Sequence, residues 1–287
     1  MFVIMQFLKS VSLVFLVFLF LGTSKPSETV SCREIIEKML DSVRVIKTQR
    51  FDVKATERVN GGFLFAESRV KLHNSPKKIY LNNPHKGLEI LWVEGANKGN
   101  ATVRTRTIPF VNLDLDPYGS LMRKDQHHTI FELGSQYIGV TFANTILRAP
   151  KDFDKHFKFA GSLKWNNIDC YQIMIDFPEY KYIEYTVSKG ETVTSISHKL
   201  STSDYKIRFK NELSSYFGTI KEGKKLMIPI PYSNKVIVYI DKKTFIPINL
   251  KVYDEEGLFE EYEFFNMQIN IPFASNEFSK EFKGYGF

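Results

Sequence analysis

The spacing of apolar residues predicts a helix at the start of the folded chain and strands after it. From residue 32 to about 48, apolar positions recur every three or four residues, as on one face of a helix. They are Ile35, Ile36, Met39, Leu40, Val43 and Ile46. Ser31 and Glu34 fit a capping box, in which the serine hydroxyl accepts the backbone N–H of the glutamate. We therefore expect an amphipathic helix from about 32 to 48.

Beyond residue 50 the apolar period falls to two, which indicates strands with one buried face. Residues 51–55 and 64–72 alternate in this way, and Asn60-Gly61-Gly62 between them is typical of a hairpin turn. Further short strands are predicted at 77–81, 88–93, 101–105, 156–163, 171–177, 236–240, 248–252 and 259–267. Residues 113–119 have the composition of a turn, and 129–146 have apolar spacing compatible with a helix. The pattern predicts an antiparallel meander behind a leading helix.

Residues 185–232 interrupt this meander with a strand, two helices and a returning strand. Residues 185–187 are apolar in alternation, Gly190 follows in a turn, and Thr192 can cap a helix. The returning strand, 225–228, is stopped by Pro229. Strand patterns lie on both sides, so we expect a βααβ unit inserted between two strands of the larger sheet.

The inserted segment resembles a LysM module, a small fold that binds N-acetylglucosamine-containing glycans such as peptidoglycan or chitin. Its opening motif, Tyr-x-Val-x-x-Gly-[Asp/Glu]-Thr-[apolar]-x-x-Ile, is matched by Tyr185, Val187, Gly190, Glu191, Thr192, Val193 and Ile196. Its closing motif, Ile-x-x-Gly-x-x-[apolar]-x-Ile-Pro, is matched by Ile220, Gly223, Leu226, Ile228 and Pro229.

In that family the glycan lies in a shallow groove between the loop after the first strand and the loop before the last. The resemblance implies glycan contacts at Gly190, Glu191, Thr192 and Val193 on one side, and at Ile220, Lys221, Glu222 and Gly223 on the other. The chain departs from the family at Asn211-Glu212, where Asn-Pro is usual, and in the extra residues 213–218. The alternative is a module that serves only as a rigid spacer.

Outside the insert, the chain resembles the periplasmic lipoprotein-carrier superfamily, which includes outer-membrane lipoprotein-sorting proteins, and within it an uncharacterised secreted bacterial family. The resemblance is carried by Ile-Asp-x-x-Thr-x-x-Pro at 240–247, by Glu57-Arg58 and by residues 113–117. It implies a curved, partly open sheet around helices, with an apolar hollow that receives acyl chains. Aromatic residues on the predicted strands suit such a hollow, or alternatively fill an ordinary core: Phe51, Phe63, Phe65, Phe177, Phe259, Phe264 and Phe265.

The N-terminus has the layout of a secretory signal. Lys9 precedes an apolar run at residues 11–21, and the small residues Gly22-Thr23-Ser24 follow it. We expect a signal peptide at 1–24, cleaved after Ser24, with an uncleaved anchor as the alternative. The protein is then extracytoplasmic, in the periplasm. Its net charge of +7 suits an anionic partner such as a lipid headgroup or wall polymer, whereas export excludes nucleic acid.

Two cysteines, Cys32 and Cys170, are the only ones in the sequence. In an oxidising compartment such a pair is expected to form a disulfide. Two alternatives concern Cys32 alone. It follows Ser31, as in lipid-attachment signals, and it begins a helix, where the dipole can activate a thiolate.

No catalytic, metal or cofactor site is predicted. His127-His128, near Asp114, Asp116 and Glu132, is the cluster most suggestive of metal or acid–base chemistry. Adjacent histidines point in different directions in a strand or a helix, so they seldom share one metal. A wall-acting hydrolase with Cys32 as nucleophile and His127 or His128 as base is the enzymatic alternative.

These patterns together predict an α+β protein without enzymatic activity. A curved antiparallel β half-barrel with a leading helix and inner helices, at 32–184 and 233–287, would carry the LysM-type module at 185–232. The expected function is binding: peptidoglycan-type glycan through the module, and a lipid or lipoprotein acyl chain in the host domain. A purely structural envelope scaffold is the remaining alternative. We expect deletion of the segment 185–231 to leave the host folded, because its ends lie close together.

Overall fold

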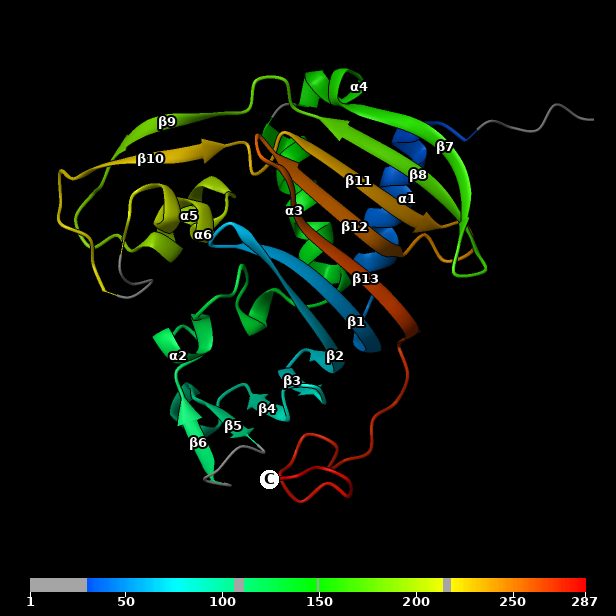
Figure 1. Cartoon of the computed structure of the whole chain (residues 1–287). Helices are drawn as coiled ribbons and strands as arrows, with labels where there is room; N and C mark the ends of the chain where they lie inside the picture. The colour runs from blue at the N-terminus through cyan, green and yellow to red at the C-terminus, as the bar shows by residue number, and fades with distance from the viewer. Residues whose placement is uncertain (1–29, 106–110, 149, 214–217) are drawn as a thin grey trace, which may run out of the picture. The chain divides into compact units, whose positions relative to one another are not determined.

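An eleven-stranded antiparallel sheet dominates the computed structural model, which describes residues 30–105, 111–148, 150–213 and 218–287 (Figure 1). Within those ranges the strand order is β6-β5-β4-β3-β2-β1-β13-β12-β11-β8-β7. The strands are β1 Thr48–Val59, β2 Gly62–Asn74, β3 Lys77–Asn83, β4 Leu88–Val93, β5 Ala101–Thr105, β6 Asn112–Leu115, β7 Phe157–Trp165, β8 Ile168–Asp176, β11 Lys235–Asp241, β12 Pro247–Asp254 and β13 Gly257–Ile269. The predicted signal peptide at 1–24 lies outside the described residues.

The central hairpin of the sheet is formed by β1 and β2. Val59 pairs with Gly62, and the two residues between them, Asn60 and Gly61, have φ values of 50° and 80°. Positive φ at both positions is the signature of a type I′ turn, whose twist matches that of the strands. The predicted hairpin at 60–62 is therefore present, with longer strands than its alternation alone indicated.

Two helices, α1 Cys32–Arg44 and α3 Ser135–Arg148, lie within the curve of the sheet (Figure 1). They pack closely because Gly139 of α3 has no side chain: a Cβ there would lie 2.4 Å from Val43 of α1. The leading helix ends four residues earlier than predicted, because β1 begins at Thr48. The helix predicted at 129–146 starts later, after Gly134 with its φ of 85°.

Short helices fill the connections on either side of α3. They are η1 Asn97–Gly99, α2 Ser120–Arg123, η2 Ile130–Glu132, η3 Pro150–Asp152 and α4 Phe153–His156. The segment predicted as a turn at 113–119 instead begins inside β6, which pairs with β5 and forms one edge of the sheet.

The C-terminal segment, 271–287, covers part of the outer face of the sheet. Its Tyr285 ring stacks on Tyr80 at 3.7 Å between centroids, and its Glu277 pairs with Lys71 at 2.8 Å. Lys71 points away from the core because its neighbours on β2, Val70 and Leu72, are buried on the inner face. The sequence pattern gave no sign of this cover.

The insert is a βααβ unit built from β9 Lys181–Thr186, α5 Val193–Leu200, α6 Asp204–Lys210 and β10 Lys225–Ile230. β9 and β10 pair with each other, apart from the large sheet. A small core holds the unit together: Val187, Val193, Ile196, Ile207, Leu226 and Ile228. The chain leaves the sheet after β8 and returns in β11, and these two strands are hydrogen-bonded neighbours.

The predicted disulfide is corrected by the structure, in which Cys32 and Cys170 are both free. Cys32 begins α1, whereas Cys170 lies on β8, where its strand neighbour is Leu163 of β7. The thiol of Cys170 instead lies 3.3 Å from the backbone carbonyl oxygen of Ile168.

Candidate functional site

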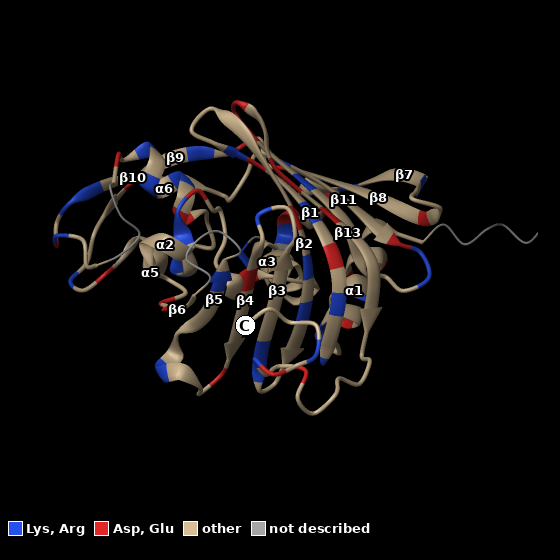
Figure 2. Ribbon diagram, turned by 60° about the horizontal axis from the view of Figure 1, so that its bottom comes forward, with Lys and Arg blue, Asp and Glu red and all other residues tan. Residues whose placement is uncertain are grey.

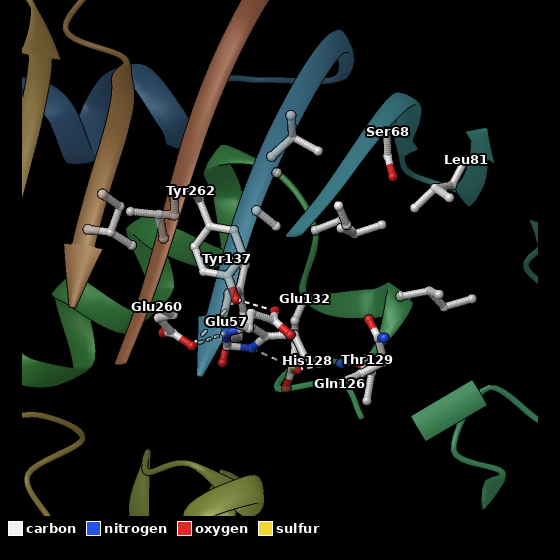
Figure 3. Close-up of a pocket in the computed structure, with 18 of the residues that line it drawn as sticks. Glu57, Ser68, Leu81, Gln126, His128, Thr129, Glu132, Tyr137, Glu260 and Tyr262 are labelled. Carbon is white, nitrogen blue, oxygen red and sulfur yellow. Dashed lines mark hydrogen bonds and ion pairs between the residues drawn. The ribbon is translucent and has the colours of Figure 1, made fainter. Parts of the chain in front are cut away.

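A cavity of about 490 Å³ lies on the inner side of the sheet, between the strands and α3 (Figure 3). Every strand of the sheet contributes side chains to the lining of the cavity, and most of these side chains are apolar. They include Phe51, Val53, Ala55, Ala66, Leu81, Leu88, Ile90, Val103, Leu113, Leu115, Leu121, Ile138, Phe142, Phe157, Ile175, Phe177, Val236, Leu250, Val252 and Phe264. Inward residues alternate with outward ones on each strand, so the period of two seen in the sequence creates this lining.

The exposure of the lining residues distinguishes a closed part from a mouth. Phe51, Phe157 and Ile175 are almost fully buried. By contrast, Leu121 is 71% exposed and Leu113 is 43% exposed. The cavity therefore opens beside β6 and α2 and ends among buried aliphatic and aromatic side chains.

The aromatic residues named from the sequence lie in different environments in the structure. Phe51, Phe177 and Phe264 line the cavity. Phe63 and Phe65 are exposed on β2, and Phe265 packs against Trp165. The strand aromatics therefore fill neither a single core nor a single hollow.

One wall of the cavity is polar and centres on Glu260 of β13 (Figure 3). Its carboxylate accepts from Tyr232 Oη at 2.9 Å, and it pairs with His127 Nδ1 at 2.8 Å and His128 Nε2 at 3.3 Å. Burial alone would raise the pKa of Glu260, but the two imidazole rings hold it well below its usual value. This carboxylate is therefore ionised inside the protein.

His128 carries the complementary charge. Its Nδ1 lies 3.3 Å from Glu132 Oε2, so each ring nitrogen faces a carboxylate. Burial opposes protonation, yet Glu260 and Glu132 raise the pKa of His128 well above 6.5. The rings of Tyr137, Tyr232 and Tyr262 lie around it at 5.5, 6.5 and 5.6 Å.

His127 completes the network on the far side of Glu260. Its Nε2 lies 3.1 Å from the carbonyl oxygen of Arg58, and its backbone N–H donates to Glu57 at 3.2 Å. Both ring nitrogens thus face oxygen atoms, one of Glu260 and one of the Arg58 backbone. The second Glu57 oxygen accepts from Tyr262 Oη at 2.6 Å.

The network continues into the insert through Glu132. This carboxylate pairs with His198 of α5 at 3.2 Å, in addition to His128. Burial would raise the pKa of Glu132, but hydrogen bonds from His128 and His198 lower it well below its usual value. Histidines and carboxylates thus alternate in one network of paired side chains that runs from the insert along the cavity wall: His198, Glu132, His128, Glu260 and His127.

Helix α6 docks the insert onto the sheet. Buried Asp204 pairs with Arg123 of α2 at 2.9 Å. Buried Lys206 pairs with Asp254 at 3.2 Å and lies 4.1 Å from the ring centroid of Phe259. Each of these buried charges needs its partner, because an unpaired charge inside the protein lowers the stability of the fold.

Apolar contacts complete this docking face. Tyr205 packs with Val59, Val252 and Phe259, and its hydroxyl accepts the backbone N–H of Asn60 at 3.0 Å. The insert therefore rests on the turn of the β1–β2 hairpin and on β12 and β13. These contacts argue against our expectation that the host stays folded when the segment 185–231 is deleted, because deletion would expose Phe259 and leave Arg123 without Asp204.

The two loops predicted to bind glycan lie side by side. The backbone N–H of Ile220 donates to the Glu191 carbonyl at 2.8 Å, and that of Gly223 donates to Val187 at 2.9 Å. Gly190 and Gly223 have φ values of 83° and 78°, so both turns use the left-handed conformation. The structure thus brings together residues separated by about 30 positions in sequence.

Several of the predicted contact residues have roles inside the module. Val193 is buried in its core, and Thr192 caps α5 by accepting the N–H of Ser195. Hydrogen bonding to Lys199 lowers the pKa of Glu191 to about 2, and Ser188 and Tyr185 also donate to it. The exposed members of the set are Gly190, Lys221, Glu222 and Gly223.

The histidine pair, which the sequence analysis set aside, proves to be central to the polar wall. Of the acidic neighbours named with it, Glu132 joins the network, whereas Asp114 accepts from Asn97 at 2.8 Å and Thr102 at 3.0 Å elsewhere. Glu57 and Glu260 were missed, because no local motif links them to the histidines. Within the described residues no group of His, Cys, Asp and Glu is arranged to hold a metal ion.

Cys32 does not have the environment of a nucleophile. Burial raises the pKa of its thiol to about 11, and Asp154 adds to the effect. A thiol at this pKa is protonated at neutral pH. The hydrogen bonds of His127 and His128 go to Glu260, Glu132 and Arg58. Among the described residues no helix is both long and apolar enough to cross a membrane.

Comparison with solved structures finds matches of low sequence identity and low structural similarity. MucB in complex with MucA(peri) matches with a TM-score of 0.40 and 10% identity, over 87% of this chain and 59% of that one. LprF from Mycobacterium bovis matches with a TM-score of 0.40 and 8% identity, over 85% of this chain and 94% of that one. A LolA superfamily protein from Nitrosomonas europaea matches with a TM-score of 0.32 and 10% identity, over 88% of this chain and 98% of that one. These values are too low to carry over a ligand or an activity.

Sequence comparison adds a family but no characterised relative. A search of curated proteins found no match. The LysM resemblance of the insert stays a prediction, because the family match concerns a different family. That match covers residues 47–209, more than half of the chain, and the chain therefore belongs to DUF1571, a family of proteins of unknown function.

Proposed function

We propose that the protein is a non-enzymatic, exported binding protein of the cell envelope that holds an apolar ligand in the cavity of its half-barrel. The observation that carries this proposal is the cavity itself. Its volume of about 490 Å³ falls within the range of small-molecule sites, roughly 300–1,000 Å³. Its lining is mostly aliphatic and aromatic, and a filled core would leave no such space.

Displacement of an apolar fluorescent dye tests this proposal. The dye should gain fluorescence on binding, and a long-chain lipid should displace it. Val53→Trp places a large ring inside the cavity from the buried part of β1, and should reduce dye binding. Lys54→Trp is the matched control, since residue 54 lies on the outer face of the same strand. Equal dye binding by both variants and the wild type would place the dye elsewhere and contradict the proposal.

We further propose that the insert binds an N-acetylglucosamine-containing glycan such as peptidoglycan. Support comes from the loops at 188–193 and 218–224, which are hydrogen-bonded to each other and expose Gly190, Lys221, Glu222 and Gly223. Basic residues recur along the insert, which suits an anionic wall polymer (Figure 2). They are Lys181, Lys189, Lys199, Lys210, Lys221, Lys224 and Lys225.

Pelleting with purified peptidoglycan tests the glycan proposal in the intact protein. Gly190→Val and Gly223→Val should weaken pelleting, because valine disfavours the left-handed conformation by about 1–2 kcal/mol. A loss of that size corresponds to roughly tenfold in affinity. Gly161→Val on β7, also at positive φ, is the control for general destabilisation. Unchanged pelleting by both loop variants would leave the module as a spacer.

A further inference from the structure

Resting on the proposed apolar site, we propose that its ligand is an amphiphile with a single acyl chain and an anionic head. The chain would occupy the buried part of the cavity. The head would lie at the mouth, against Lys86 and Lys124. The argument has three steps: the volume, the saturation of the polar wall, and the charges left at the mouth.

The cavity volume matches one acyl chain. If a methylene group takes up roughly the 30 Å³ that a water molecule occupies in the liquid, about 490 Å³ holds about 16 such groups. A lipid with two or three long chains would leave most of its apolar surface in water. The ligand class that fills the space is therefore a single-chain lipid.

The polar wall is not the place for the head group, because its charged atoms are already paired. Glu260 accepts from Tyr232 and pairs with two histidines, and Glu132 pairs with two histidines and accepts the Thr129 N–H. Glu57 accepts from Tyr262 and from the His127 N–H. A ligand head directed there would have to break one of these buried interactions.

Two lysines remain among the charged residues that line the cavity. Lys86, in the β3–β4 turn, and Lys124, at the end of α2, are exposed and have no carboxylate partner among the described residues. The positions of their backbones are fixed. The Lys86 N–H donates to Asn83 at 2.9 Å, and the residue before Lys124 is the buried Arg123. Exposed Leu113 and Leu121 line the same cavity, so its mouth combines cationic and apolar side chains, as suits an anionic amphiphile.

The head-group test uses three probes with one 16-carbon chain, each below its micelle concentration. Palmitate carries a carboxylate, 1-palmitoyl-lysophosphatidate a phosphate, and 1-monopalmitoylglycerol a neutral head. At low salt we expect the anions to bind about tenfold more tightly than the neutral probe, since two exposed charge pairs contribute modestly each. Added salt should reduce the difference in affinity between the anionic probes and the neutral probe, because it screens exposed charges. The anion that binds more tightly identifies the source of the head.

The double variant Lys86→Glu/Lys124→Glu should abolish the preference for anions while keeping the affinity for monopalmitoylglycerol. Lys243→Glu, exposed in the β11–β12 turn, is the matched control and should keep the preference. Equal binding of neutral and anionic probes by the wild type would overturn this inference and leave the apolar site standing. Failure of every probe and of the dye would overturn the proposed function itself.

Chain length provides an independent test of the single-chain claim. Affinity should rise by about fourfold per methylene, as each buried group contributes about 0.8 kcal/mol, and then level off near 16 carbons. Ala55 and Ala66 face each other across β1 and β2 in the lining. Ala66→Phe should move the plateau to shorter chains, whereas Ala66→Ser should not. Affinity that keeps rising well beyond 20 carbons would contradict a cavity for one chain.

Discussion

Glu260 organises much of the polar wall of the cavity. Its carboxylate meets two imidazole rings and a tyrosine hydroxyl, all within 3.3 Å. A buried carboxylate is stable only with such partners, because its removal from water costs several kcal/mol. The partners come from segments far apart in the chain, so this one side chain ties β13 to the loops before η2 and β11.

Glu260→Gln should lower the free energy of unfolding by about 3 kcal/mol, since it leaves His128 with a buried charge and one carboxylate fewer. Chemical denaturation at neutral pH measures the change. Glu263→Gln, on the other face of the same strand, should stay within about 0.5 kcal/mol of the wild type. Equal stability of the two variants would show that the network does not stabilise the fold.

His198 should report the contact between insert and host through its titration. The hydrogen bond to Glu132 raises the pKa of His198 above 6.5. A raised pKa in the folded state means that the protonated ring stabilises the docked insert below about pH 6.5, and that this contribution is lost as the pH rises through the folded-state pKa. NMR titration of the imidazole measures it.

Glu132→Gln should return the pKa of His198 toward 6.5, whereas Glu67→Gln on β2 should leave it unchanged. A titration curve for His198 that does not respond to Glu132→Gln would contradict the contact.

At the scale of single residues, the sequence revealed one half of the network. The pair His127-His128 and Glu132 stand within a few positions of one another and were named together. Glu260 follows them by about 130 residues, and its side chain meets theirs because of strand register and loop packing. Neither can be read from composition or spacing, so the network was visible only in the folded chain.

The insert behaves as an element of the fold and not as a tethered appendage. Its helix α6 is docked by Arg123–Asp204 and Lys206–Asp254, and α5 reaches Glu132 through His198. The DUF1571 match also runs to residue 209, across α5 and into α6 of the insert. The residue pattern predicted a βααβ unit here, which the structure has, but the docking face could not be inferred from a module considered alone.

Arg123→Met should destabilise the protein by about 3 kcal/mol or more, because Asp204 then remains buried without its partner. The double variant Arg123→Met/Asp204→Leu should recover a large part of that loss, since both charges are removed together. Denaturant unfolding of the single and double variants gives the coupling energy.

The exposed pair Lys225–Glu184, also in the insert, provides the comparison. Its coupling energy should be much smaller than that of the buried pair, because water screens exposed charges. A double variant of the buried pair that is less stable than both single variants would contradict the docking role.

Alternation of apolar residues predicted most strands correctly, because inward and outward positions repeat with a period of two in every long strand. The exceptions are informative. β6 is a short edge strand with turn-like composition, and it exists because β5 offers it a hydrogen-bonding edge. The C-terminal cover depends on Tyr285 meeting Tyr80, a contact with no signal in local sequence.

For the whole molecule, sheet and insert belong to one compact unit, Ser31–Phe287. We therefore expect a single thermal transition by calorimetry, with equal calorimetric and van't Hoff enthalpies. A bound lipid should raise the midpoint of that transition in proportion to the logarithm of its concentration. Two resolved transitions, with the first assigned to the insert by His198 NMR signals, would show that the docking face does not couple the parts.

The pairing of β1 with β13 has a consequence for how the chain acquires its structure. These strands meet in the middle of the sheet, yet Gln49 pairs with Ile269, more than 200 residues later. Until β13 has been made, β1 presents an open row of backbone donors and acceptors, which other chains can pair with. Contacts between distant residues also form slowly. The last strand thus sets the earliest time at which the sheet can close, and the nascent chain is most prone to self-association before then.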